Sequence, residues 1–116
     1  MATFTKDKLS GSTNGKQIAV AATAIGSGTT IHTAVSGTSS WDEVWLFASN
    51  ISTSSVALTL GWGETGDSGL TKIDLPPNQG KILVVAGEII QNSLVIKAAA
   101  GTANVVNISG FVNRIS

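Results

Sequence analysis

His32 is the only histidine in the chain, and histidine is the side chain best suited to proton transfer near neutral pH. Together with the plentiful Ser and Asp residues it supplies the residue types of a Ser-His-Asp hydrolase site. However, no G-x-S-x-G sequence marks a nucleophilic serine. His32 also lies in Thr29–Thr33, a run of strand-forming residues. We therefore expect an outward-facing strand histidine, and we expect replacement of His32 by alanine to leave any function intact.

The segment from Gly61 to Gly66 matches G-x-G-x-x-G, the pattern of a dinucleotide-binding turn. That turn needs a helix directly after it, whereas here Asp67 and Ser68 lead into another expected strand. Glu64 and Asp67 are too few carboxylates for a calcium loop. We interpret this segment as a solvated hairpin loop. Because the chain also has no cysteine, the sequence predicts no catalytic residue, no metal site and no cofactor.

Three tryptophans carry most of the large aromatic surface, since the chain has no tyrosine. Trp45 and Trp62 lie on expected strands and are predicted to pack. Trp41 lies where a loop meets a strand, and it is the best candidate for a contact with a partner. A carbohydrate-binding module is the alternative interpretation. It requires an exposed tryptophan beside Asn, Asp or Glu in a groove.

Charged residues make up only 12% of the chain, and 7 basic residues balance 7 acidic ones. An average soluble domain has about 25% charged residues. So few charges give a small monomer little protection against association. The balance also argues against nucleic-acid binding, which needs clustered Lys and Arg. No apolar run approaches the ~20 residues that cross a membrane, so neither a nucleic acid nor a membrane is an expected partner.

Glycine, serine and threonine interrupt the chain at intervals of about ten residues, and β-rich runs lie between the interruptions. This spacing predicts an all-β protein, a jelly-roll-like antiparallel β-sandwich of about eight strands. The domain is expected to span residues 17–116, after a polar N-terminal arm over residues 1–16. The expected strands are 17–24, 29–34, 43–49, 56–62, 70–75, 81–86, 93–100 and 103–115.

Two expected strands have apolar residues on both faces. In the strand 43–49, Trp45 and Phe47 point away from Val44, Leu46 and Ala48, and the strand 81–86 is predicted to be central. A single sandwich covers only one face of each strand, so a loop, an arm or another subunit must cover the second. The arm is either a frayed terminus or a docking element, and a truncation starting at Gln17 separates the two. The candidate interface residues are Phe4, Leu9, Trp41, Trp45, Phe47, Leu83 and Val85.

Several local phrases resemble those of small jelly-roll decoration, or cement, proteins of tailed bacteriophages. They are KLSGS (8–12), TIHTA (30–34), DEVWLFASN (42–50) and GFVNRI (110–115). The resemblance implies a virion protein on the capsid surface, a homotrimer, and the major capsid protein as partner. We therefore expect a structural protein, not an enzyme, that stabilises a capsid where capsomers meet. Similar jelly rolls occur in head and tail fibres, so a carbohydrate-binding fibre module remains the alternative.

Overall fold

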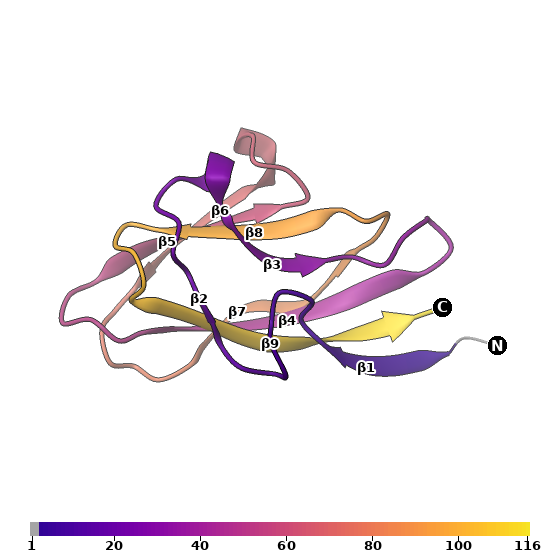
Figure 1. Ribbon diagram of the computed structural model, residues 1–116, viewed down its shortest axis with the longest axis horizontal. Helices are drawn as coiled ribbons and strands as arrows, with labels where there is room; N and C mark the ends of the chain where they lie inside the picture. Colours follow the sequence, from indigo (N-terminus) through magenta and orange to yellow (C-terminus); the bar gives the residue numbers. More distant parts are fainter. Residues whose placement is uncertain (1–2) are drawn as a thin grey trace.

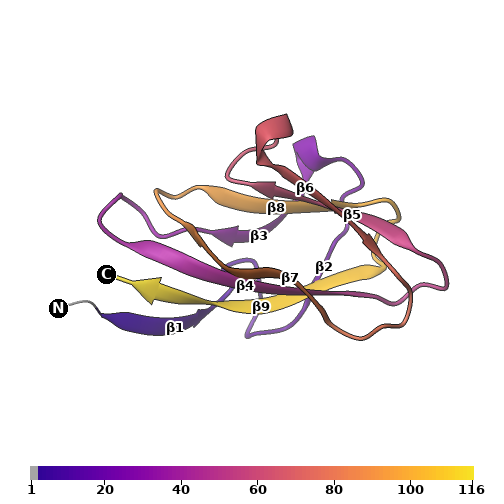
Figure 2. The same ribbon diagram turned by 180° about the vertical axis from the view of Figure 1, so that it is seen from behind.

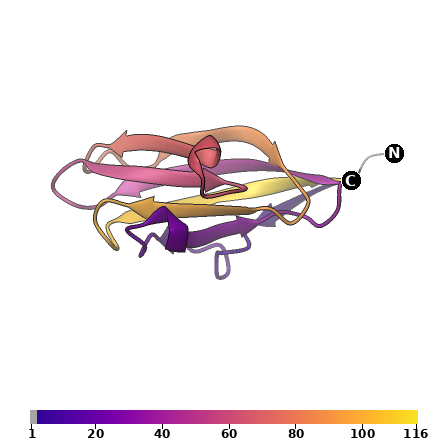
Figure 3. The same ribbon diagram turned by 90° about the horizontal axis from the view of Figure 1, so that it is seen from above.

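Two antiparallel β-sheets pack face to face in the computed structural model, which describes residues 3–116 (Figure 1). The molecule measures 48 × 27 × 21 Å, and the strands of both sheets run roughly along its long axis (Figure 3). The five-stranded sheet contains β1 (Phe4–Lys8), β2 (Ile18–Ala19), β4 (Trp41–Asn50), β7 (Ile82–Ile90) and β9 (Val106–Ile115). The four-stranded sheet contains β3 (Thr29–Thr33), β5 (Val56–Trp62), β6 (Leu70–Leu75) and β8 (Val95–Ala100). Two short 3₁₀ turns, η1 (Ile25–Ser27) and η2 (Asp67–Gly69), lie in the connections.

The strand order confirms the predicted jelly-roll-like sandwich. The first sheet has the order β1-β9-β4-β7, with β2 also paired to β9, and the second has the order β3-β8-β5-β6. β1 and β2 pair with successive parts of the same edge of β9, so together they form one interrupted edge strand (Figure 2). When β1 and β2 are counted as one strand, the sheet β2-β9-β4-β7 faces the sheet β3-β8-β5-β6. This is the arrangement of an eight-stranded double-sheet jelly roll.

The core lies between the sheets and follows the period-two alternation that the sequence predicted. In β4 the side chains of Val44, Leu46 and Ala48 are fully buried, and their neighbours are half-buried on the opposite face. In β5, Leu58 and Leu60 are buried while Ala57 is exposed. Alternate side chains of a strand point to opposite faces, so each sheet gives one apolar face to the core.

The N-terminal segment differs from the predicted arm. β1 pairs along its whole length with β9, from Phe4 opposite Ile115 to Lys8 opposite Phe111. Leu9 follows β1 and lies in the core with 1% of its surface exposed. The physical reason is that the edge of β9 has unpaired backbone groups, which a polar strand satisfies as well as an apolar one. Residues 4–12 therefore belong to the folded domain; Met1 and Ala2 of the predicted arm lie outside the described residues.

β7 is the other departure from prediction, because it is an edge strand and not a central one. It pairs only with β4, and it continues through the predicted connection 87–92 as far as Ile90. Val85 faces the core, whereas Leu83 is 47% exposed. Leu9 and Val85 were both expected at an interface, but burial in the core removes them from contact with a partner. The predicted first strand was too long, since β2 covers only Ile18–Ala19.

Candidate functional site

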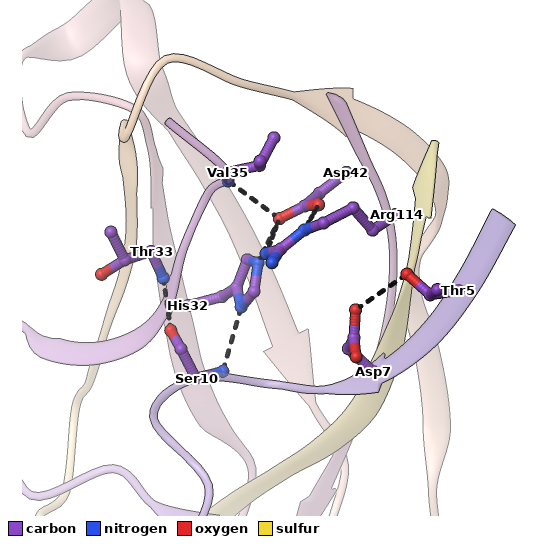
Figure 4. Close-up of polar contacts among 8 residues, drawn as sticks. All are labelled: Thr5, Asp7, Ser10, His32, Thr33, Val35, Asp42 and Arg114. Atoms are coloured by element: carbon purple, nitrogen blue, oxygen red, sulfur yellow. Dashed lines mark hydrogen bonds and ion pairs between the residues drawn. The ribbon is translucent and has the colours of Figure 1, made fainter. Parts of the chain in front are cut away.

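A buried polar cluster joins the two sheets, and His32 is at its centre (Figure 4). We call the side chains of Ser10, His32, Asp42 and Arg114, with the Ser10 backbone, the His32 cluster. His32 is 1% exposed, so the prediction of an outward-facing histidine was wrong. The Ser10 N–H donates to His32 Nδ1 at 3.0 Å, and His32 Nε2 lies 2.7 Å from Asp42 Oδ2. Since Nδ1 accepts a hydrogen bond, the proton of the neutral ring is on Nε2 and is donated to Asp42.

Asp42 is fully buried and has three hydrogen-bonding partners. Arg114 donates from Nε to Oδ1 at 2.7 Å and from Nη2 to Oδ2 at 3.0 Å, and the Val35 N–H donates at 3.1 Å. Burial alone would raise the pKa of Asp42, but the hydrogen bonds from Arg114 and His32 and the charge of Arg114 outweigh it and lower the pKa below its usual value. The bond to Asp42 likewise raises the pKa of Arg114. The two residues form a bidentate ion pair that stays charged at neutral pH.

The segment that follows β1 connects the His32 cluster to the four-stranded sheet. Ser10 Oγ accepts the Thr33 N–H at 2.6 Å, and the Gly11 N–H donates to the Ile31 carbonyl at 2.9 Å. A Cβ atom on Gly11 would overlap the Thr30 carbonyl oxygen, so only glycine permits this close approach. Ser10 and Gly11 therefore join the strand β1 of one sheet to the strand β3 of the other along this edge of the sandwich. His32 Nδ1 bonds this segment and Nε2 bonds Asp42 on β4, so both ring nitrogens take part in joining the two sheets.

The exposed face of the five-stranded sheet is the second feature, and we call it the outer face. The Trp45 and Phe111 rings stack across β4 and β9, with centroids 6.2 Å apart and planes at 13°. Lys6 Nζ lies 4.3 Å from the centre of the Phe111 ring, a cation–π geometry. Three of the expected interface residues, Phe4, Phe47 and Leu83, also lie on the outer face, and Phe4 is 68% exposed. Ile89, which was not among the expected residues, lies there too.

Polar groups fix the orientation of Trp45 on this face. Its indole N–H donates to Glu43 Oε1 at 2.8 Å, and the Asn113 amide donates to the same oxygen at 3.2 Å. These two bonds lower the pKa of Glu43. Next to the stacked rings is a hollow of about 400 Å³ between Phe47 and Phe111, with Lys81 at its rim. The outer face thus combines rigid aromatic side chains with a hollow, as protein-binding surfaces do.

Trp41 and Trp62 come together at a separate groove of about 660 Å³. Trp41 begins β4 and Trp62 ends β5, so the two rings come from different sheets. The predicted packing of Trp62 is confirmed, since Trp62 packs against the core while staying partly exposed. Trp41, for which the sequence predicted a contact, is also partly exposed, and the convergence of the two rings was not predicted. The remaining lining residues are Thr38, Ile89, Ile90, Gln91 and Leu94.

No family model, curated protein or solved structure matches this chain. Across residues 3–116, no three His, Asp or Glu side chains gather closely enough to hold a metal ion. Over the same residues, no helix has the length and apolar content needed to cross a membrane.

Proposed function

We propose that this protein is a structural virion protein that decorates a bacteriophage capsid, and that it docks through the outer face. The supporting observation is the row of aromatic side chains that a single chain leaves partly exposed there, with Trp45 stacked on Phe111. The resemblance of the phrases at 8–12, 30–34, 42–50 and 110–115 to decoration proteins gives the partner its identity, the major capsid protein. The low charge content agrees with a surface that is covered in an assembly.

The mechanism is mechanical. Aromatic side chains dominate the energy of protein interfaces, and burying apolar surface is worth roughly 25 cal/mol per Å². Trp45 loses little freedom on docking because Glu43 already holds its indole. A copy bound where capsomers meet must be detached before the shell expands or ruptures. Because a symmetric shell has many equivalent binding sites, the binding free energies of the bound copies add along each joint.

Self-association belongs to the same proposal. We propose a homotrimer with residues 44–49 and 81–86 near the threefold contact. The contact between copies uses the outer backbone edge of β7, which is unpaired within the described chain, and it leaves the aromatic rings of the outer face to the capsid. A closed threefold arrangement covers this edge without extending into a filament.

The proposal is tested by preparing capsids of the phage that encodes the chain both with and without the protein. We expect decorated capsids to survive heating and osmotic shock better than bare ones. Phe47→Ala should reduce this protection, because Phe47 lines the hollow of the outer face. Lys72→Ala is the matched control, since Lys72 is exposed on β6 of the opposite sheet. Equal survival of bare and decorated capsids would contradict the proposal.

A further inference from the structure

We infer that the groove between Trp41 and Trp62 is a binding site for a neutral saccharide. The inference does not depend on the capsid role, because the groove and the hollow of the outer face lie at different ends of β4. Trp41 is the first residue of that strand, and Phe47 is six residues further on. At about 3.3 Å per residue, the two are separated by roughly 20 Å. Ile89 belongs to both the outer face and the groove, so docking that extends from the hollow as far as Ile89 would narrow the groove.

The hydrogen-bonding groups of the groove are unoccupied. Trp45 donates its indole N–H to Glu43, but within residues 3–116 neither Trp41 nor Trp62 has such a bond, and no buried polar side-chain atom lacks a partner. Both indole N–H groups are therefore exposed to solvent. The Thr38 hydroxyl and the Gln91 amide, which also line the groove, make no hydrogen bond to the described chain either. A ligand in the groove would meet two indole rings, the aliphatic side chains of Ile89, Ile90 and Leu94, and a few free donors and acceptors.

The groove has none of the Asn, Asp or Glu residues expected beside the tryptophan of a carbohydrate module, and Gln91 and Thr38 are the polar side chains that take their place. A pyranose ring has an apolar C–H face that packs on an aromatic ring, and hydroxyl groups at its edge that satisfy N–H and amide groups. An apolar peptide could offer its backbone groups to the indole N–H groups and the Gln91 amide only in particular backbone orientations, whereas the hydroxyls around a pyranose ring both donate and accept. A nucleic acid needs Lys or Arg, and none lines the groove. The volume of about 660 Å³ lies in the range of small-ligand sites.

The experiment is affinity electrophoresis of the folded, full-length protein in native gels that contain a neutral polysaccharide. The probes are dextran, laminarin, galactomannan and hydroxyethyl cellulose, each in its own gel. We expect at least one of them to retard the native protein. Trp41→Ala and Gln91→Ala should weaken that retardation at least tenfold in apparent dissociation constant. Ile51→Ala is the matched control, because it removes an exposed apolar side chain that lines neither the groove nor the hollow, and its retardation should equal that of the native chain.

Two results would overturn the inference. One is the absence of retardation of the native protein by all four polysaccharides, and the other is equal retardation of the native protein and Trp41→Ala. If Trp41→Ala does not fold, Gln91→Ala and Thr38→Ala decide, since both alter only the rim of the groove. A change in native mass on mutation of Trp41 would also overturn it, because the groove would then be a contact between copies. Capsid binding by Trp41→Ala, measured in parallel, separates failure of this site from failure of the capsid role.

Discussion

Asp42→Asn is the most informative single substitution, because it changes one charge and almost no volume. The asparagine oxygen, placed where Oδ2 is, still accepts from His32 Nε2, the Val35 N–H and Arg114 Nη2. Its amide nitrogen then takes the place of Oδ1 and faces Arg114 Nε, which also donates. The variant therefore keeps three hydrogen bonds, and it loses the bond from Arg114 Nε and the ion pair.

The expected cost follows from this geometry. A hydrogen bond between charged groups contributes about 1.5–3 kcal/mol. Arg114 is 36% exposed and can turn toward water, which reduces the penalty of leaving it unpaired. We expect the free energy of unfolding to fall by about 2 kcal/mol at pH 7. For a domain of this size that corresponds to a melting temperature lower by roughly 8 °C.

The pH dependence gives this prediction a second test. The pKa of Asp42 in the folded protein is below its ordinary value of 3.8. Its contribution to stability is therefore complete above the unfolded-state pKa, and it is lost as the pH falls through the folded-state pKa. The difference between native protein and Asp42→Asn should be constant from pH 7 to about pH 5 and should shrink below about pH 4.

Urea unfolding monitored by tryptophan fluorescence, at several pH values, measures both quantities. Asp74→Asn is the control, because Asp74 is an exposed carboxylate on β6 and should change stability by less than about 0.5 kcal/mol. A loss of less than about 0.5 kcal/mol for Asp42→Asn at pH 7 would contradict a stabilising role of the ion pair. So would a destabilisation that is equal at pH 7 and pH 3.

Three further predictions concern the fold and the assembly. Leu9→Ala should lower the free energy of unfolding by about 2–5 kcal/mol in chemical denaturation, because Leu9 is a core residue. A change under about 0.5 kcal/mol would mean that Leu9 belongs to a loosely attached arm, as the sequence predicted. Gly110→Ala should prevent folding or lower the melting temperature sharply, because a Cβ at φ +153° would overlap the Trp45 carbonyl oxygen; an unchanged melting curve would contradict the close approach of β9 to β4. Light scattering at micromolar concentration should give three times the chain mass of 11.8 kDa, and a monomer mass would exclude the trimer.

The strands with strict alternation were predictable from the sequence. β5 and β6 begin and end where the sequence placed them, since turn residues bound each and side chains in β5 alternate between core and solvent. β1 was not predictable in the same way. It has no apolar alternation, because an edge strand needs backbone partners more than buried side chains. Only Leu9, an apolar residue in a polar segment, indicated that this part of the chain returns to the core.

The His32 cluster was missed because its members are distant in the sequence. Ser10 is 22 residues from His32, and Arg114 is 72 residues from Asp42. One local indication was present. Asp42 occupies the same face of β4 as Val44 and Leu46, and a carboxylate on a core-facing position needs a buried partner. The partner itself depends on the register of β9 with β4, which places Arg114 directly opposite Asp42.

A reconstruction of the decorated capsid by electron cryomicroscopy tests the central proposal most directly. We expect density for this jelly roll over the joints between capsomers, with the outer face, including Trp45, Phe47 and Phe111, against the shell. The four-stranded sheet should then point toward solvent. Density with β3, β8, β5 and β6 against the shell would contradict the docking face, and a shell that remains bare at saturating protein would contradict the capsid role itself.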